Sequence, residues 1–460
     1  MLFRSNDDRK VIIEDNTITA AAVANTAVGM YLYNTNAESV IEGNTIDLSA
    51  SAYTTETVYW DYPYGIYLGG CAGTTVRENT ITLSQRGSGI YLGRGSTTTP
   101  VPNVITRNTI STSNAVSDAL GESCGISSSS DIAFDIIGEQ QYNSNNTISN
   151  NAISGFVRGI LLHEGSTYTV TATIYDNSIT ASGSYAVDAS TLTRATADAS
   201  ANWWGTSTAA DVASLVSANV DYTPWLESGT DTSTDPGFQG DFATLRVDDA
   251  SPQVGAVGRI QEGIDLVSGS TVNVEPGLYT ERVVITKSLT LLGATHDVNK
   301  NGYMIPANYA WDTLVESVID YPDPTGITTT LPLMDVQTDT VTIKGFVMQM
   351  LNARCGYDDN LLRVDASMVG GVGTTRHDVV IENNILGPTT NTASQNGTCG
   401  RMGLYLASPA YPTRRRGITD SRIAGNTIFG AEGNGNNIFV WGSSTTRSEE
   451  HTSELQSPNT

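Results

Sequence analysis

Positive charge is scarce in this sequence. Lysine and arginine together number 24, against 48 aspartates and glutamates, so the formal net charge is −24 at pH 7. Such an acidic chain repels the phosphates of nucleic acids and of anionic lipid surfaces. We therefore expect no nucleic-acid partner. An acidic, lysine-poor chain rich in threonine, serine and asparagine is typical of a secreted or cell-surface protein, which is the location we expect.

Long apolar runs are missing as well. No stretch is long and apolar enough to span a bilayer, so we expect no membrane insertion by this chain. A signal peptide is not recognisable, because Met1–Arg4 runs at once into charged residues and then into a repeat. We interpret the chain as starting inside a longer protein, and the missing signal is then no argument for a cytoplasmic location.

Cysteine and histidine are rare, with four residues of each. None of the cysteines belongs to a Cys-x-x-Cys pair, which disfavours a zinc knuckle. The histidines are isolated from one another in the sequence, so we expect no metal site.

What the sequence has in abundance is a short repeat. Ile13–Ile18 follows the pattern aliphatic-x-x-Asn-x-Ile, and this pattern returns along the chain. The asparagines at its centre are Asn16, Asn44, Asn79, Asn108, Asn151, Asn177, Asn383 and Asn426. Asparagine tolerates the left-handed backbone region, and its amide can hydrogen-bond along a stack of identical amides. We predict that each asparagine marks a corner between two strands and that the corners stack as a ladder. The acidic residues just before them, Asp176 among these, are expected to face solvent.

A second recurring piece precedes most corners, as in Gly29–Leu32, Gly65–Leu68 and Gly89–Leu92. Its aliphatic residues alternate, so one face of a strand points inward and the other outward. The intervals between corners vary, as expected when loops vary in length and strands do not. Coils of this kind pair strand to strand in parallel, about 4.8 Å apart. A propeller would need antiparallel hairpins, and a sandwich would not repeat its corner residue.

The sequence therefore predicts an all-β fold made of two tandem right-handed parallel β-helices, each with a short helical or aromatic cap. Residues 1–228 form the first, closed by a tryptophan-rich cap around Trp203, Trp204 and Trp225. Those tryptophans could instead serve as a sugar platform, although a cap is the favoured interpretation. Residues 229–242, rich in Asp, Thr, Ser and Gly, are predicted to be a linker.

Residues 243–446 are predicted to form the second β-helix, truncated and without a closing cap, and its N-terminal cap helix is expected within 257–267. In one of its coils, Phe346 takes the place of the corner asparagine. Residues 447–460 resemble the conceptual translation of a sequencing adapter, and we interpret them as an artefactual tail.

A helix at 257–267 followed by short alternating strands resembles the N-terminal cap of the pectin-lyase-like superfamily. The Asn202–Gly205 and Tyr222–Leu226 stretches look like the closure of bacterial secreted β-helix proteins. The superfamily includes esterases, lyases and inert surface proteins, so the resemblance implies a fold and leaves the activity open. A resemblance to periplasmic proteins that assist metal-enzyme maturation is disfavoured by the scarcity of histidine.

Two of the cysteines precede strands that would stack in adjacent coils. Cys355 lies before Leu361–Val364, and Cys399 lies before Gly403–Leu406. Stacking would bring the two sulfurs to a separation that a disulfide accepts, so we predict a Cys355–Cys399 bridge.

Two groups of residues could carry a function. Lyases of this superfamily use carboxylates for calcium with a basic residue, and hydrolases use paired aspartates. No such motif matches residue by residue. The densest charged region comprises Asp358, Asp359, Arg363, Asp365, His377, Asp378, Arg401 and the run Arg414–Arg416, of which Asp358, Asp359, Asp365, Asp378 and Arg401 are the candidate catalytic residues. We favour solvated loop charge there over an anionic-sugar or calcium site, and calcium would be a cofactor only in a lyase.

The other group is Tyr31, Tyr67 and Tyr91, which are predicted to point outward as an aromatic ladder. Aromatic rings can stack on sugar rings, although a ladder that only stabilises neighbouring strands is the favoured interpretation. The leading hypothesis is a non-enzymatic scaffold for adhesion or for contact with a polysaccharide or cell-surface glycan. The alternative is a polysaccharide lyase or glycoside hydrolase.

Overall fold

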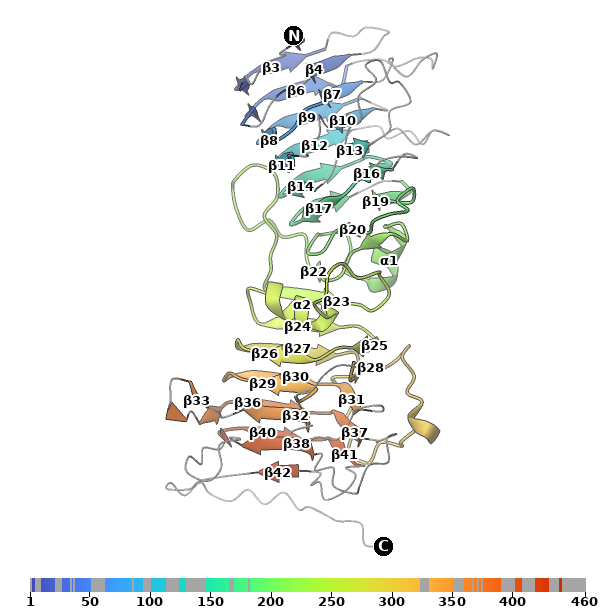
Figure 1. The fold of residues 1–460 in the computed structure, drawn as a ribbon, viewed down its shortest axis with the longest axis vertical. Coiled ribbons are helices and arrows are strands. Elements are labelled where there is room, and N and C mark those ends of the chain that lie inside the picture. The colour runs from blue at the N-terminus through green and yellow to red at the C-terminus, as the bar shows by residue number, and fades with distance from the viewer. Residues whose placement is uncertain are drawn as a thin grey trace, which may run out of the picture. The chain divides into compact units, whose positions relative to one another are not determined.

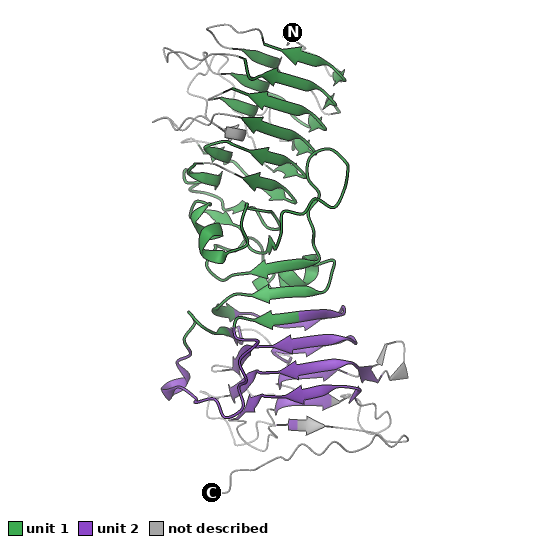
Figure 2. Ribbon diagram, turned by 180° about the vertical axis from the view of Figure 1, so that it is seen from behind, with its two compact units in different colours: residues 1–279, 291–294, 312–317 green, residues 280–290, 295–311, 318–460 purple. Residues whose placement is uncertain are grey.

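The computed structural model divides into two compact units. Unit 1 comprises residues 1–279, 291–294 and 312–317, and unit 2 comprises residues 280–290, 295–311 and 318–460 (Figure 2). The residues whose structure is described are 2–4, 10–20, 27–33, 35, 38–50, 63–84, 87–93, 101–112, 124–129, 145–164, 169–180, 183–322, 331–350, 360–365, 368–369, 372–373, 375–389, 402–407, 418–429 and 438–440.

Unit 1 contains three parallel sheets, to which each turn of the chain contributes one strand (Figure 1). Sheet A consists of β1 (Leu2–Arg4), β4 (Val28–Tyr33), β7 (Tyr64–Gly69), β10 (Ser88–Leu92), β13 (Cys124–Ser129), β16 (Arg158–His163) and β19 (Tyr185–Asp188). Sheet B consists of β2 (Ile12–Glu14), β5 (Val40–Glu42), β8 (Thr75–Arg77), β11 (Val104–Thr106), β14 (Asn146–Ser149), β17 (Ala172–Tyr175), β20 (Ala197–Asp198) and β21 (Val220–Asp221). Sheet C consists of β3 (Thr17–Thr19), β6 (Thr45–Leu48), β9 (Thr80–Leu83), β12 (Thr109–Thr112), β15 (Ala152–Ser154) and β18 (Ser178–Thr180).

The core of unit 1 is a set of aliphatic columns. Ile41, Val76 and Ile105 occupy matching positions on successive strands of sheet B, and all three are fully buried. Sheets A and C send similar columns into the same interior. Alternation of inward aliphatic and outward polar residues therefore determines the register, because a shift by one residue would turn each column outward.

A glycine column allows successive strands of sheet A to approach one another closely. A Cβ atom built on Gly65 would lie only 2.4 Å from the carbonyl oxygen of Gly89, on the next strand. Gly29 has the same relation to Gly65, at 2.5 Å. Side chains at these positions would therefore clash with the backbone of the neighbouring turn.

The predicted asparagine ladder is confirmed in unit 1. The side-chain amide of each ladder asparagine donates to Oδ1 of the next one, and these Nδ2–Oδ1 distances are 2.9–3.0 Å. The series consists of Asn16, Asn44, Asn79, Asn108, Asn151 and Asn177. The ladder has one further member, because Asn177 donates to Asn202 at 2.9 Å. Asn202 was missed because the sequence around it lacks the aliphatic-x-x-Asn-x-Ile pattern.

The residue that adopts the left-handed conformation is the one before each asparagine, and our assignment of it to asparagine was wrong. Glu78, Arg107 and Asp176 have φ values of 58°, 57° and 53°, whereas no ladder asparagine of unit 1 has a positive φ among the described residues. The left-handed residue turns the chain, and the asparagine behind it points inward, where its amide satisfies backbone carbonyls. Asn79, for example, donates to the carbonyl oxygens of Ile41 and Arg77.

A shorter polar ladder stands at another corner and was not predicted. The backbone N–H of Thr74 donates to Oδ1 of Asn103, and the Asn103 amide donates to Oδ1 of Asn146 at 3.2 Å. Thr74 and Asn103 immediately precede strands of sheet B, and Asn146 is the first residue of β14. Their mixed chemistry gives no repeating sequence pattern, which is why the ladder could not be recognised.

The end of the first β-helix is closed by a cap, as predicted. Trp204 and Trp225 are buried, and helix α1 (Ala209–Ser214) contributes buried Val212. The elements that follow are β22 (Trp225–Leu226), β23 (Thr244–Val247), α2 (Arg259–Leu266) and β24 (Thr271–Val274), and α2 is the helix predicted within 257–267. Strand β23 pairs antiparallel with β22 and parallel with β24.

Residues 229–242 are not an extended linker, and that prediction was wrong. The Phe238 N–H donates to the carbonyl oxygen of Asn150 at 2.9 Å, and the Phe238 side chain is buried. The segment therefore packs on the corners of the first β-helix, and the division between the units falls after residue 279 rather than at 229–242.

Unit 2 is also built from parallel strands. Strands β30 (Val341–Lys344), β36 (Val379–Glu382) and β40 (Arg422–Ala424) are successive neighbours in one sheet, and β31 (Phe346–Met350), β37 (Ile385–Thr389) and β41 (Thr427–Ile428) are successive neighbours in another. Sheet F consists of β26 (Val283–Ile285), β29 (Met334–Val336), β32 (Asn360–Asp365), β38 (Met402–Ala407) and β42 (Ile438–Val440). The other elements of the chain are β25 (Gly277–Thr280), β27 (Leu289–Gly293), β28 (Ser317–Asp320), β33 (Met368–Val369), β34 (Val372–Gly373), β35 (Arg376–His377), β39 (Ile418–Thr419) and the 3-10 turn η2 (Ala307–Tyr309).

The ladder of unit 2 contains Asn384 and Asn426, and the prediction of Asn383 was wrong by one residue. The Asn384 amide donates to Oδ1 of Asn426 at 3.2 Å, whereas Asn383 has a φ of 58° and donates to the carbonyl oxygen of His296. Val380 and Ile381 are both aliphatic, so the sequence pattern fits two registers. Phe346 occupies the ladder position on the preceding turn, as predicted, and its backbone N–H donates to Oδ1 of Asn384.

Several predictions fall outside the described residues. These are the Cys355–Cys399 bridge, the positions of Asp358, Asp359 and Arg401, and the tail at 447–460. Among the described residues, no helix has both the length and the apolar character needed to cross a membrane.

Candidate functional site

The three predicted tyrosines form a stacked row on the outer face of sheet A. Tyr67 is in register with Tyr31 and with Tyr91 on the two neighbouring strands. The Tyr31 and Tyr67 ring centroids lie 4.4 Å apart with planes 3° from parallel, and those of Tyr67 and Tyr91 lie 5.0 Å apart with planes 20° from parallel. The alternation of the strand explains this arrangement, since Ile66 and Leu68 point inward on either side of Tyr67.

The stacking determines which surfaces of the tyrosine rings a ligand can contact. Each ring face of Tyr67 is covered by a neighbouring tyrosine, so the row does not present a series of open faces on which sugar rings could stack. Burial, reinforced by Tyr31 and Tyr64, raises the pKa of the Tyr67 phenol, which therefore stays a neutral hydrogen-bonding group.

Two further tyrosines that were not predicted complete this group. The Tyr64 ring meets Tyr67 edge-on, with centroids 5.4 Å apart, and tilts against Tyr91 at 5.2 Å. A Cβ on Gly69 would lie 2.8 Å from the rings of both Tyr33 and Tyr67, so the absence of a side chain there gives the rings their space. Tyr33 and Tyr64 lie two and three residues from predicted members, and their proximity in sequence was the available signal.

A second group lies on sheet F of unit 2. Arg363 forms a two-point ion pair with Asp335, at 2.8 and 2.7 Å, and also lies 3.3 Å from Asp365. The side chains of Asp335, Asp365 and Arg363 are only 3%, 9% and 13% exposed. Asp365 is therefore not solvated loop charge, and that part of the prediction was wrong. Two carboxylates converge on one guanidinium, but their charges are largely compensated within the group.

Asp378 lies in a different, exposed setting. Its carboxylate is 2.8 Å from Nδ1 of His377, and Asp339 is 3.3 Å from Nε2 of the same ring. The hydrogen bond with Asp378, together with the charge of Asp339, raises the pKa of His377. Arg376 connects the two settings, because its Nε donates to the carbonyl oxygen of Asp365 and its guanidinium lies 3.9 Å from Asp339.

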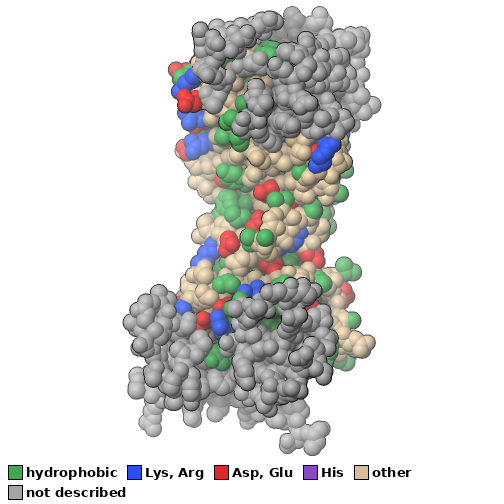
Figure 3. Space-filling model, in the orientation of Figure 1, with side chains coloured by type: hydrophobic (Ala, Val, Ile, Leu, Met, Phe, Trp, Pro, Cys, Tyr) green, Lys and Arg blue, Asp and Glu red, His purple; other side chains and the backbone are tan. Residues whose placement is uncertain are grey.

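Other charged side chains are paired along the turns. Arg77 pairs with Glu42 at 2.7 Å, and Arg107 with Glu78 at 3.3 Å. Figure 3 shows acidic and basic groups interspersed over the coloured surface of this view. Within the described part of the chain, no group of three or more His, Cys, Asp or Glu side chains is arranged to hold a metal ion.

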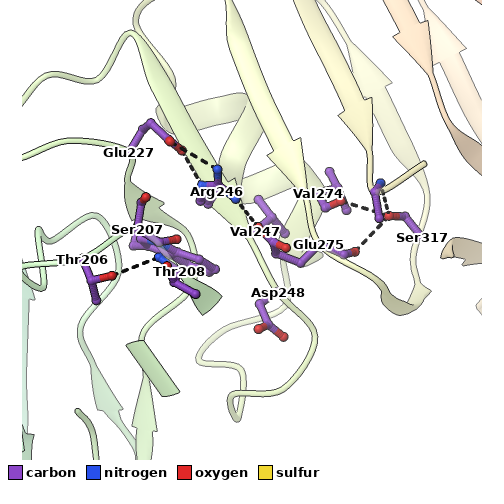
Figure 4. A network of polar contacts seen from close by, with 12 residues as sticks. Thr206, Ser207, Thr208, Glu227, Arg246, Val247, Asp248, Val274, Glu275 and Ser317 are labelled. Carbon is purple, nitrogen blue, oxygen red and sulfur yellow. Dashed lines mark hydrogen bonds and ion pairs between the residues drawn. The ribbon is translucent and has the colours of Figure 1, made fainter. Parts of the chain in front are cut away.

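The cap of unit 1 contains a charge network with a structural character. Arg246 on β23 bonds to Glu227, which follows β22, and to Glu275, which follows β24 (Figure 4). Ser317 then donates to the carbonyl oxygens of Val274 and Glu275 at 2.9 Å. Arg246 therefore connects β23 to the segments that follow β22 and β24, through one carboxylate on each.

Comparison with known proteins agrees with this geometry. A family model described as a right handed beta helix region matches residues 2–114 and 51–200, the part of unit 1 that contains the ladder from Asn16 to Asn177 and the tyrosine row. No curated protein and no solved structure matches the chain significantly.

Proposed function

The chain is a parallel β-helix repeat protein, and we propose that it acts as a non-enzymatic, secreted or cell-surface scaffold that contacts a polysaccharide along the outer face of sheet A. The observation that carries this proposal is the in-register row of Tyr31, Tyr67 and Tyr91. Stacked rings place phenol groups at the spacing of the strands, and hydroxyl groups both donate and accept hydrogen bonds. An extended glycan lying along this row would meet a repeating set of such groups.

The charge of the chain selects among glycans. A net charge of −24 disfavours polyanions such as uronate-rich or sulfated polymers. The proposed ligand is therefore a neutral polysaccharide.

The test uses the triple variant Y31F/Y67F/Y91F, which removes the phenol oxygens and keeps the rings. Retention of the wild type and the variant is compared by affinity electrophoresis in gels that contain neutral or anionic polysaccharides. At about 1 kcal/mol for each hydrogen bond, loss of all three should weaken binding by roughly two orders of magnitude. Thermal unfolding should change little, because the stack remains.

Tyr175→Phe is the matched control, since Tyr175 is a tyrosine on the outer face of sheet B and is 42% exposed. It should leave retention unchanged. Equal retention of the wild type and the triple variant, or no retention of the wild type by any neutral polymer, would refute the proposal.

A polysaccharide-active enzyme is the second candidate, favoured by one specific observation. Asp335 and Asp365 converge on Arg363 on an outward-facing row of sheet F. A lyase or hydrolase of this kind would lose its activity in D365N while retaining its fold. Depolymerisation assays on uronate and neutral polymers, with D378N as the exposed control, separate this candidate from the scaffold. Calcium dependence would favour a lyase.

A further inference from the structure

A cavity of about 390 Å³ lies on the outer face of sheet B in unit 1. Its floor is formed by the outward side chains of β17 and β20, including Thr173, Tyr175 and Asp198. Its other side is formed by Phe242 and by helix α2, which contributes Glu262 and Leu266. Two later segments of the chain thus cover a face that the repeat alone would leave open.

The first of these segments, residues 237–242, is named the strap here. The Gly240 N–H donates to Oδ1 of Asp176 at 2.7 Å. A Cβ on Gly240 would lie 2.4 Å from Leu226 and 2.9 Å from the Asp176 carboxylate, so the backbone itself rests on this corner. Gly237, with a φ of 85°, approaches Arg107 and Asn150 in the same way. The strap therefore crosses three successive corners of the ladder, at Arg107, Asn150 and Asp176.

Asp176 was expected to face solvent, and the strap is the reason that it does not. Burial raises the pKa of its carboxyl to about 6, and the charge of Asp231 acts in the same direction. The Gly240 N–H and the Asn150 amide oppose the shift. The Asp176 carboxyl, which accepts a hydrogen bond from the strap, is therefore easier to protonate while the strap covers it.

Glu262 lines the cavity from the side of helix α2. Burial raises its pKa to about 7, and Asp221 and Asp198 add to the shift. The Ser200 hydroxyl and the Arg259 guanidinium oppose it. Burial also raises the pKa of Asp198, which lies on the floor of the cavity and bonds to Ser200. Carboxyl groups from the floor and from helix α2 therefore line the same cavity.

We propose that the strap and helix α2 form a pH-sensitive cover over sheet B, closed under mildly acidic conditions and loosened when Asp176 and Glu262 ionise. Covering the carboxyls removes water from them, which disfavours their charged forms. The closed state consequently binds more protons than the open state. The equilibrium constant for opening must therefore rise with pH, until both groups are ionised in the closed state as well. Loosening would expose Phe242 and increase the exposure of Tyr175, the two aromatic residues that line the cavity.

Hydrogen exchange of the full chain tests this directly. The amides of Gly240 and Phe238 report the two strap contacts, and their protection is corrected for the intrinsic pH dependence of exchange. The wild type should lose protection at both amides by at least tenfold between pH 5 and pH 8. In D176N/E262Q this loss should disappear, because the replacements keep the shape and do not titrate.

Asp235→Asn is the matched control, since Asp235 is an exposed carboxylate in the chain segment leading to the strap. It should behave as the wild type does. Protection that is the same at pH 5 and pH 8 in the wild type would overturn the proposal, and so would an unchanged pH response in D176N/E262Q. The single variant E262Q, expected to lose part of the response, covers the case in which the double variant does not fold. Unchanged Asn79 protection in each protein shows that the β-helix itself is intact.

Discussion

Replacing one buried ladder asparagine should destabilise unit 1 far more than its small size suggests. Asn79 is fully buried, and its side chain has five contacts within hydrogen-bond distance. Its Oδ1 accepts from the backbone N–H and the side-chain amide of Asn44, and its own amide donates to Ile41, Arg77 and Asn108. Asn79→Ala removes the side chain and leaves the partners inside the solenoid.

The magnitude follows from these contacts. The amide has two N–H groups for its three acceptors, so the side chain makes at most four full hydrogen bonds, which at about 1 kcal/mol net each correspond to about 4 kcal/mol. Part of this is recovered if water enters the space, and we expect a loss of about 3 kcal/mol in the free energy of unfolding of unit 1. Asn16→Ala is the matched control. Asn16 is exposed at the end of the described ladder, and its loss should cost about 1 kcal/mol.

The measurement is urea unfolding followed by circular dichroism, with hydrogen exchange at Ile81 and Ile110 to localise the effect. Stability in a stacked repeat is the sum of local terms, so protection should fall most in the turns next to Asn79. A loss for Asn79→Ala that is no larger than that for Asn16→Ala would refute the reasoning, because the ladder would then contribute nothing beyond a surface polar contact.

Three further predictions concern other parts of the molecule. Arg363→Met should lower the free energy of unfolding of unit 2 by about 3 kcal/mol, because it leaves Asp335 and Asp365 buried without their cation; an unchanged urea midpoint would contradict this. Gly65→Ala should lower the free energy of unfolding by about 2 kcal/mol, because the new Cβ would lie 2.4 Å from the Gly89 carbonyl oxygen. The measurement is the Tm, and an unchanged Tm would contradict the prediction, since the two strands could then move apart at no cost. The folded-state pKa values of Asp176 and Glu262, about 6 and about 7, lie above their ordinary values, so the stability linked to their protonation is complete below about pH 4 and is lost as pH rises through 6 and 7. The Tm of the wild type should therefore fall from pH 5 to pH 8 more steeply than that of D176N/E262Q, and equal slopes would contradict the assignment.

Most of the fold could be predicted from the repeat pattern in the sequence. A corner asparagine recurs with inward aliphatics at fixed offsets, and these two features determine strand direction, register and the ladder from Asn16 to Asn177. The pattern failed where two registers fitted equally well, as at Asn383 and Asn384. It also failed where the corner was irregular, as at Asn202, or was built from unlike residues, as at Thr74 and Asn103.

The contacts made by non-repeating segments could not be predicted. Residues 229–242 have the composition of a linker, and only the close approach of Gly237 and Gly240 to the ladder corners shows that they pack. Asp335 was missed because a lone aspartate in an alternating strand has no distinguishing neighbours. The tyrosine row was predicted from its spacing, but spacing does not specify ring orientation, and the orientation determines whether faces or edges are exposed.

The central claim is that successive turns of unit 1 stack in parallel register. Glu14, Glu42 and Tyr175 lie in one outward row of sheet B, with Glu42 one turn and Tyr175 five turns beyond Glu14. Spin labels at Glu14→Cys and Tyr175→Cys should be separated by roughly 24 Å, and labels at Glu42→Cys and Tyr175→Cys by roughly 19 Å, since each turn adds about 4.8 Å. Electron–electron distance measurements that give these two values support the stack. Separations well beyond 30 Å, or a difference between the two pairs unrelated to one strand spacing, would contradict it.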